Sequence, residues 1–379
     1  MLLRTKGWML LGLCLWGSAL VAQGASVAAK GGVGPSTPST SEWLLCPELL
    51  DHAHLKIVWQ QALPLKKGET FATITLLDGR LYLRSDRNYL WSLDAAKGDF
   101  VFSRSVAPRG IPVLSLDRYG DTLISVVGNQ LTESRDDTGT DLRVSDLELS
   151  IVAPPARNSL YFYIPGADRR LHVFRADDLV RVFKATADDD SLITTVCADE
   201  TLVVFGTATG NVVAMAADAP KKLWSFKAAG GIAGSVVREG NSFFLASKDT
   251  HVYRIDAMDT NAVQLIWRFQ TEAVLDRAPR VTEGFVYQYA VGRGLTAIDK
   301  QTGRAVWALP EGVDLLAEAG GKAYVITKVR TLAVMDNTAG KRLYSVNCAP
   351  VTGHAANTEN ARIYVADELG RVVCLEPSR

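Results

Sequence analysis

The sequence has no excess of charge of either sign, with 41 Lys and Arg residues against 41 Asp and Glu residues in a chain of 379. A protein that binds nucleic acid normally carries a clustered basic excess that neutralises phosphates, so this balance argues against that class of partner. At 47% hydrophobic and 22% charged residues, the composition is that of a globular protein. Disordered and collagen-like chains are therefore excluded.

Cysteine is scarce, with only five residues in the chain. The four that follow the N-terminal apolar segment, Cys46, Cys197, Cys348 and Cys374, include no close pair that would indicate a disulfide framework. Thiols buried one at a time are the simplest interpretation. A long-range bridge from Cys46 to a C-terminal cysteine is the alternative.

Long apolar runs are also missing, apart from residues 8–22 near the N-terminus. This run follows Arg4 and Lys6 and is shorter than the roughly 20 residues that a membrane-spanning helix needs. It predicts a signal peptide over residues 1–24, with a retained anchor as the alternative. Residues 25–54, rich in Gly, Pro, Ser and Thr at their start, are interpreted as a flexible linker and lead-in. We therefore expect an exported protein, periplasmic or secreted, with membrane association left open.

The remainder of the chain, residues 55–379, repeats itself about every forty residues. A position that is acidic in the clearest copies recurs at Asp94, Arg135, Arg175, Ala216, Asp256, Asp299, Asp336 and Glu376. A position in the middle of a strand recurs in step at Tyr82, Leu123, Tyr161, Val203, Phe244, Tyr287, Tyr324 and Tyr364. A third position, in the last strand of each unit, is occupied by Trp59, Phe102, Leu142, Phe183, Trp224, Trp267, Trp307 and Tyr344.

Each of the eight units contains about four short runs rich in Val, Ile, Tyr, Phe and Leu, bounded by turn residues, without a sustained helical period. A single four-stranded antiparallel sheet cannot bury both of its faces, but sheets packed radially around an axis cover one another. The fold predicted is therefore all-β, an eight-bladed β-propeller.

The two ends of the repeating region do not coincide with unit boundaries. The eighth unit stops near Glu376 without an outer strand, whereas residues 55–59 form an orphan strand ahead of the first unit. We expect this N-terminal strand to pair with residues 372–375 and to complete the last blade, which leaves no exposed edge at the closure.

Large side chains at the third repeating position are expected to pack between neighbouring blades. Burial of each one stabilises the fold by roughly 1.5–3 kcal/mol. The predicted blade-packing aromatics are Trp59, Phe102, Phe183, Trp224, Trp267, Trp307 and Tyr344.

The segment LTAIDKQTGRAVW at residues 295–307 resembles the pyrroloquinoline-quinone-like (PQQ-like) propeller repeat, in which a strand ending in Ala-x-Asp is followed by a Thr-Gly-Lys/Arg turn and a Trp. The resemblance extends over about residues 55–376 and is strongest in the first, sixth and seventh units. In layout the chain is similar to the BamB-like outer-membrane assembly proteins. This resemblance implies a non-catalytic propeller that acts as a protein-interaction scaffold in the cell envelope.

Quinoprotein dehydrogenases share this propeller, and in that family the quinone is held between a Trp and a disulfide of adjacent cysteines. No adjacent cysteines occur in this sequence. Two weak metal candidates, residues 51–54 and 136–141, are better interpreted as a solvated lead-in and a polar turn, because neither has a complete ligand set. We expect no catalytic residue, no cofactor and no metal ligand.

Arg277 and Arg280 lie in the segment that enters the sixth unit, where two guanidinium groups could hold a carboxylate-bearing partner. They are the candidate partner-binding residues. The expected partner is an envelope or outer-membrane protein, and the propeller itself is expected to be monomeric. The alternative is an enzyme of quinoprotein or other type, or a binder of a small molecule or glycan, with its site in the central channel.

Overall fold

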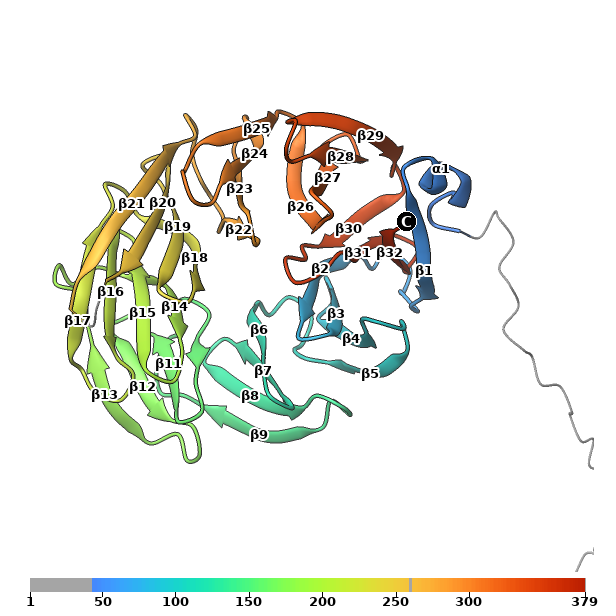
Figure 1. Ribbon diagram of the computed structural model, residues 1–379. Helices are drawn as coiled ribbons and strands as arrows, with labels where there is room; N and C mark the ends of the chain where they lie inside the picture. The colour runs from blue at the N-terminus through green and yellow to red at the C-terminus, as the bar shows by residue number, and fades with distance from the viewer. Residues whose placement is uncertain (1–42, 259–260, 379) are drawn as a thin grey trace, which may run out of the picture. The chain divides into compact units, whose positions relative to one another are not determined.

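The structure is a computed structural model that describes residues 43–258 and 261–378. In these residues, eight four-stranded antiparallel sheets are arranged as blades around a central opening (Figure 1). The predicted eight-bladed β-propeller is therefore confirmed. The predicted signal peptide and most of the predicted linker, residues 1–42, lie outside the described residues.

Blades 1 to 4 follow one another along the chain, each running from the inner to the outer strand. Blade 1 contains β2 (Phe71–Leu77), β3 (Arg80–Ser85), β4 (Tyr89–Asp94) and β5 (Phe100–Ser105). Blade 2 contains β6 (Val113–Tyr119), β7 (Thr122–Val127), β8 (Gln130–Arg135) and β9 (Asp141–Asp146). Blade 3 contains β10 (Ala156–Arg157), β11 (Tyr161–Pro165), β12 (Leu171–Arg175) and β13 (Arg181–Ala185). Blade 4 contains β14 (Ile193–Ala198), β15 (Leu202–Thr207), β16 (Asn211–Ala216) and β17 (Lys222–Lys227).

Blades 5 to 7 keep the same order, and only blade 8 draws a strand from the other end of the chain. Blade 5 contains β18 (Ile232–Glu239), β19 (Ser242–Ser247), β20 (His251–Ala257) and β21 (Val263–Gln270). Blade 6 contains β22 (Arg280–Val281), β23 (Phe285–Ala290), β24 (Gly294–Asp299) and β25 (Ala305–Leu309). Blade 7 contains β26 (Gly312–Ala319), β27 (Lys322–Thr327), β28 (Thr331–Asp336) and β29 (Lys341–Asn347). Blade 8 contains β30 (Val351–Ala355), β31 (Ile363–Asp367), β32 (Arg371–Pro377) and β1 (Leu55–Ala62).

The two middle strands of each blade carry the core. In β15 and β27, for example, every residue after the first is buried, because neighbouring blades cover both faces of the sheet. The outer strands alternate instead between exposed and covered positions, as in β9 and β13. Buried clusters accordingly join adjacent blades, and one of them combines Tyr287 and Trp307 of blade 6 with Leu315 and Val325 of blade 7.

The ring closes through the N-terminal strand, as predicted. Strand β1 pairs antiparallel with β32 over its whole length, from Leu55 opposite Pro377 to Ala62 opposite Arg371. This pairing is visible where the blue and red ends of the chain meet (Figure 1). The first and last strands of the propeller therefore share one sheet, and unfolding of either end opens the ring.

The lead-in to β1, the last part of the segment interpreted as a flexible linker and lead-in over residues 25–54, packs against the propeller. A short helix, α1 (Pro47–His52), begins with a proline in its first turn and buries Leu50 completely. Leu44 and Leu45 are also buried, in a cluster that includes Cys348 of the segment after β29 and Leu375 of β32. Leu44, Leu45 and Leu50 thus cover the outer part of the last two blades, a packing that the sequence did not predict.

Four of the cysteines lie in the described residues, and all four are free thiols. Cys348 and Cys374 are buried, Cys197 is half-buried, and Cys46 is exposed. The four thiols are separate, as predicted, and the alternative bridge from Cys46 is absent from this part of the chain, but the predicted burial is wrong for Cys46. Burial raises the pKa of the Cys348 thiol to about 11, so it is protonated at neutral pH.

Neighbouring blades are joined by the aromatic residue of the outer strand. The indole Nε1 of Trp267 in blade 5 donates to the carbonyl of Lys300 in blade 6 at 2.9 Å. The same ring lies flat against the turn glycine of blade 6, where a Cβ on Gly303 would be 2.6 Å from the Trp267 ring. Trp59 makes the equivalent contacts with Ala95 and Gly98 across the closure. The Gly and Trp of the repeat are therefore the two halves of one joint between blades.

The predicted blade-packing aromatics lie at these joints and are buried to different extents. Phe183 and Tyr344 are half-buried against clusters of blades 3–4 and 7–8. The other five are buried, with 4–8% of their surface exposed: Trp59, Phe102, Trp224, Trp267 and Trp307.

Blade 2 departs from the pattern, because its joint to blade 3 is polar. The register between β8 and β9 places Arg143, opposite Glu133, at the position that Trp307 occupies opposite Ala297 in blade 6. The assignment of Leu142 to this position was wrong by one residue, and Leu142 is 58% exposed. Arg143 donates to the carbonyls of Ala176 at 2.6 Å and Asp177 at 2.7 Å, so a guanidinium replaces the aromatic ring.

The mid-strand position was also misplaced in blades 2 to 4. The strand pairing puts Ile124, Tyr163 and Val204 opposite the third-strand residues of the joint, whereas the sequence pattern favoured Leu123, Tyr161 and Val203. In each of these strands at least four consecutive residues are buried, so alternation of burial gives no register.

Candidate functional site

Arg280 lies on β22, the innermost strand of blade 6, and its guanidinium is already engaged. Nε is 3.1 Å from Oδ1 of Asp314 and Nη2 is 3.0 Å from Oδ2, which is a bidentate pair with the inner strand of blade 7. On the other side, Nε2 of His354 in blade 8 is 3.5 Å from Oδ2 of the same carboxylate. The carboxylate that the sequence suggested for Arg280 is therefore supplied by the chain itself.

The Asp314 carboxylate is the centre of this three-blade contact. Its side chain is only 9% exposed, and burial by itself raises the pKa of a carboxyl group. Hydrogen bonds and positive charge from His354 and Arg280 outweigh burial and hold the pKa of Asp314 at about 2. The inner strands of blades 6, 7 and 8 are thus joined through an ionised carboxylate.

This depressed pKa predicts an acid-sensitive part of the stability. Because the folded pKa lies below the ordinary value, the contribution is complete above the ordinary pKa of about 4 and is lost as the pH falls towards 2. Substitution Asp314→Asn is expected to cost roughly 2 kcal/mol at neutral pH and progressively less on acidification. Denaturant unfolding at a series of pH values measures this difference, with Asp276→Asn in an exposed position as the control. An equal difference at neutral and acidic pH would contradict the assignment.

Arg277 is placed differently from Arg280. It lies in the connection between blades 5 and 6, where its guanidinium stacks over the ring of Tyr289 at 4.1 Å from the centroid. Nε is also 3.2 Å from Oδ1 of Asp276, in an exposed pair. Buried Leu275 anchors the connection, and the Arg277 side chain remains 38% exposed. Arg277 and Arg280 are equally exposed, and they differ in that Arg277 pairs with an exposed carboxylate and Arg280 with a buried one.

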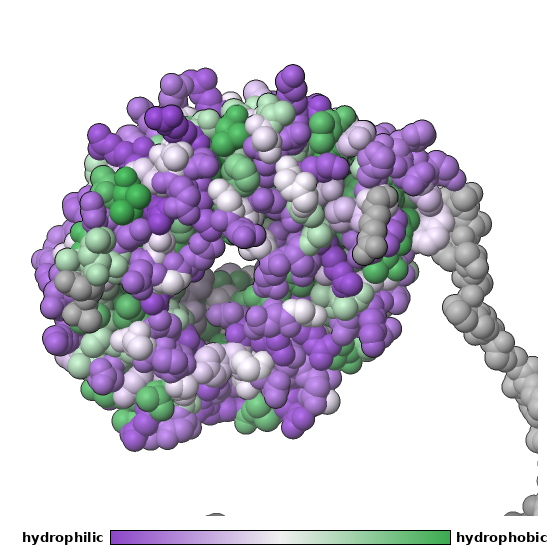
Figure 2. Space-filling view, in the orientation of Figure 1, coloured by the Kyte–Doolittle hydropathy of each residue, from purple (hydrophilic) through white to green (hydrophobic). Residues whose placement is uncertain are grey.

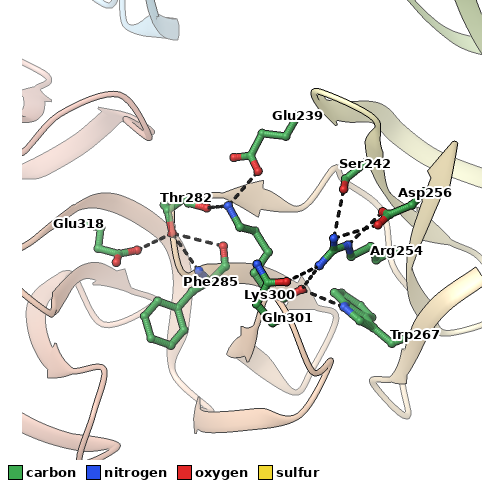
Figure 3. A network of polar contacts seen from close by, with 10 residues as sticks. All are labelled: Glu239, Ser242, Arg254, Asp256, Trp267, Thr282, Phe285, Lys300, Gln301 and Glu318. Atoms are coloured by element: carbon green, nitrogen blue, oxygen red, sulfur yellow. Dashed lines mark hydrogen bonds and ion pairs between the residues drawn. The ribbon is translucent and has the colours of Figure 1, made fainter. Parts of the chain in front are cut away.

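The junction of blades 5 and 6 contains a buried lysine surrounded by partners (Figure 3). Nζ of Lys300 is 2.8 Å from Oε2 of Glu239 and 2.7 Å from the carbonyl of Thr282. The Lys300 carbonyl accepts hydrogen bonds from the indole of Trp267 and from Nη1 of Arg254. The ammonium group and the backbone carbonyl of Lys300 therefore both join blades 5 and 6, which gives this lysine a structural role.

The same network continues into blade 7 through Glu318 on β26 (Figure 3). Its Oε2 accepts hydrogen bonds from Thr282 Oγ1 at 2.6 Å and from the Tyr287 hydroxyl at 2.7 Å. Burial, followed by the charge of Glu318, raises the pKa of Tyr287, so its hydroxyl remains a proton donor. Three consecutive blades are therefore held in fixed positions by paired polar groups.

The two ends of the ring differ in their loops. One end carries the hairpins between second and third strands together with the connections between blades, and we call it the connection face. In blades 6 to 8 these hairpins expose an apolar residue at the tip: Val291 is 48% exposed, Val329 63% and Leu369 68%. Val274 in the adjoining connection is 54% exposed, and its carbonyl accepts the amide of Val291 at 3.1 Å. These four residues define the apolar tips of the connection face.

The remaining sequence candidates have mainly structural roles. In residues 51–54, Asp51, His52 and His54 are exposed at the end of α1. In residues 136–141, Asp136 is buried, pairs with Arg118 at 3.0 Å and accepts the Tyr82 hydroxyl, so it joins blades 1 and 2. The interpretation of that segment as only a polar turn was therefore incomplete.

Two absences hold for the described part of the chain. Residues 43–258 and 261–378 contain no group of three or more His, Cys, Asp or Glu arranged to hold a metal ion. Over the same residues, no helix has the length and apolar character needed to cross a membrane. The rim of the central opening is predominantly hydrophilic in the view of Figure 2.

The polar joints made by Glu133, Arg143, Asp314 and Lys300 were not predicted from the sequence. For Arg143 a signal was present, since in blades 1, 6 and 7 the joint residue follows the acid position by eight residues, and Arg143 follows Arg135 by the same interval. For Asp314 no local signal exists, because its partners lie 34 and 40 residues away in other blades.

Comparison with known proteins agrees with this fold. A family model described as outer membrane protein assembly factor BamB matches residues 208–334, which run from blade 4 into blade 7. No curated protein matches the chain significantly.

Three solved structures illustrate the likeness in fold. The computationally designed protein Ika8 is 14% identical, with a TM-score of 0.65 over 83% of this chain and 98% of its own. BamB from Moraxella catarrhalis is 15% identical, with a TM-score of 0.62 over 85% of this chain and 97% of its own. The β-propeller domain of Cps50 (Swd1) from Myceliophteria thermophila is 12% identical, with a TM-score of 0.55 over 85% and 100%. At these identities the likeness concerns the fold.

Proposed function

We propose that this chain, a β-propeller of PQQ-like repeats with a BamB-like layout, is an exported scaffold that binds a protein of the cell envelope. Its work is recognition without catalysis, and outer-membrane protein assembly is the process that its family match suggests. A propeller suits this role, because interlocked blades present loops in fixed positions and little conformational freedom is lost when a partner docks.

The observation that carries this proposal is the set of apolar tips on the connection face. Val291, Val329 and Leu369 occupy the same hairpin in three consecutive blades and are each about half exposed or more. Blades 6, 7 and 8 beneath them are joined by the contacts of Asp314 with Arg280 and His354, which favours a fixed spacing of the tips. Regularly placed apolar groups on a rigid surface are a feature of protein interfaces.

The two buried ionisable side chains Lys300 and Asp314 support a role without catalysis. Lys300 and Asp314 are buried ionisable groups of the kind often used in catalysis, and each is paired within the fold. Lys300 contacts Glu239 of blade 5 and the carbonyl of Thr282 in its own blade, and Asp314 contacts Arg280 of blade 6 and His354 of blade 8. The sequence also has no adjacent cysteines of the kind that hold the quinone in quinoprotein dehydrogenases. We therefore assign these groups to the joints between blades.

Affinity capture from envelope extract tests the scaffold role. Wild-type protein is expected to recover a membrane-assembly protein in stoichiometric amount, and the double variant Val329→Asp, Leu369→Asp is expected to lose it, because charged groups replace the apolar tips. The matched control is Leu142→Asp, which alters an apolar residue of similar exposure on the outer edge of blade 2. A purified chain that captures nothing and reduces a dye in the presence of quinone and calcium would support the enzyme alternative instead.

A further inference from the structure

The connection face also carries a group of cations that the chain does not neutralise. They lie in the hairpin of blade 7, the connection from β1 to β2, the hairpin of blade 1 and the connection from β5 to β6. We call this group the basic arc; its members are Lys328, Arg330, Lys66, Lys67, Arg87 and Arg109. Over residues 43–258 and 261–378, no carboxylate lies within ion-pairing distance of any of the six.

Hydrogen bonds place three members of the basic arc, Lys66, Lys67 and Arg87, on one surface with the blade 8 hairpin. Nη2 of Arg87 donates to the carbonyl of Lys67 at 2.9 Å. The amide of Leu63 donates to Gly370 in the blade 8 hairpin at 2.8 Å, which places the connection bearing the lysines beside that hairpin. Arg87 Nε is in addition buried without a hydrogen-bond partner.

Acidic residues elsewhere on the same face, in the connection between blades 3 and 4, form ion pairs within the chain. Asp188 pairs with Lys222 at 2.8 Å, and Asp189 lies 3.4 Å from Lys227. Asp190 lies 3.6 Å from Arg169, and Arg170 is at the same distance. These three acids between blades 3 and 4 are thus compensated within the chain, whereas the six cations of the basic arc have no ion pair in the described residues.

The net charge of the basic arc remains positive when its own carboxylates are included. Exposed Asp86 and buried Glu69 lie in the same hairpins and connections, and exposed Glu368 lies in the adjoining hairpin of blade 8, so six cations against three carboxylates leave 6 − 3 = +3. Glu311 also lies near Lys328, but its carboxylate is paired with Arg342. The apolar tips Val329 and Leu369 stand among these charges, and Val329 lies directly between Lys328 and Arg330. Ile111, 44% exposed, extends the apolar component past Arg109.

We propose that the basic arc and its apolar residues bind an extended acidic segment of a protein partner that also carries apolar side chains. This inference rests on the proposed scaffold function and adds the surface and the chemistry of its partner. Complementary charge would steer the segment onto the face, while Val329 and Leu369 would bury its apolar side chains. The neutral balance of the whole chain, 41 against 41, favours a protein segment over a nucleic acid.

The test measures fluorescence anisotropy of a short labelled peptide in which Asp alternates with Ser and Leu. A matched peptide with Lys in place of every Asp is the charge control. We expect saturable binding of the acidic peptide that weakens as salt is added, and no saturable binding of the basic one. The variant Lys328→Glu, Arg330→Glu is expected to bind the acidic peptide roughly tenfold more weakly.

A second charge reversal, Lys97→Glu with Lys341→Glu, provides the control on the opposite face of the ring, where both lysines are exposed. Circular dichroism melts establish that both variants are folded. Equal loss of binding in the two variants would overturn the inference, as would equal binding of the two peptides. Binding of vesicles containing phosphatidylglycerol, with no binding of the acidic peptide, would also overturn it in favour of a lipid surface.

Capture from envelope extract separates this inference from the function on which it rests. If Lys328→Glu, Arg330→Glu recovers the same partner as wild type, the scaffold role stands and the assignment of the basic arc fails. If wild type recovers no partner although the acidic peptide binds as expected, the basic arc stands and the envelope scaffold fails.

Discussion

Replacement of Trp307 by alanine is expected to lower the free energy of unfolding by about 3–5 kcal/mol. The ring is 5% exposed and lies in the cluster that joins blades 6 and 7, with its centroid 5.8 Å from that of Tyr287. Its indole Nε1 donates to Oδ1 of Asn337 at 2.9 Å, so truncation removes a buried hydrogen bond as well as apolar contact. Both losses fall on a single joint of the ring.

Denaturant unfolding monitored by circular dichroism measures this effect. Leu142→Ala is the matched control, because Leu142 lies next to the equivalent position in blade 2 and is 58% exposed. The control should change the free energy of unfolding by about 0.5 kcal/mol or less. A Trp307→Ala variant with the midpoint of wild type would contradict the role of this residue in the joint.

The second large effect is expected from Glu133→Gln, at the polar joint of blades 2 and 3. The Glu133 side chain is 8% exposed; Oε2 accepts Arg143 Nε at 2.6 Å and Oε1 accepts Arg157 Nη1 at 2.9 Å. Removing its charge leaves two guanidinium groups uncompensated, at a cost of about 3–5 kcal/mol. Arg157 lies over the rings of Tyr119 and Phe162 and is held in this position by packing on both sides.

The control for this prediction is an ion pair of the same kind at the surface of the same blade. Arg135 and Asp137 are 2.7 Å apart, but their side chains are 56% and 54% exposed. Asp137→Asn should therefore change the free energy of unfolding by less than about 1 kcal/mol. If urea unfolding gives Glu133→Gln and Asp137→Asn the same stability, the polar joint does not hold the two blades together.

The number of blades and the closure of the ring could be predicted from the sequence because both depend on local patterns. Turn residues divide the chain into short apolar runs, and the orphan strand at Leu55 and the missing outer strand after Glu376 complement each other. Register was predicted well where a single aromatic such as Tyr287 or Trp307 lies opposite the joint position. In β11 three aromatics follow one another, and Tyr161 was chosen in place of Tyr163. Register was missed in blades 2 to 4, where uniformly buried strands remove the alternation that would align them.

The candidate site, in contrast to the fold, could not be predicted correctly from the sequence. Arg277 and Arg280 are three residues apart in the sequence and were given one role, but one guanidinium lies at the surface over Tyr289 and the other is paired with Asp314. The lead-in was misjudged for a related reason, since Leu44 and Leu50 are buried only because the closing blades offer them an apolar surface. Contacts across blades determine each of these outcomes.

By itself, the order of apolar runs and turns determined a closed ring of eight sheets, because each sheet needs neighbours on both faces. Only the tertiary structure decided which charges that ring neutralises. Pairing depends on distances of about 3 Å between residues of different blades, and such distances follow from how the blades meet. The same physics left Lys328 and Arg330 without a carboxylate at ion-pairing distance in the described chain, and so made the connection face the surface proposed for binding.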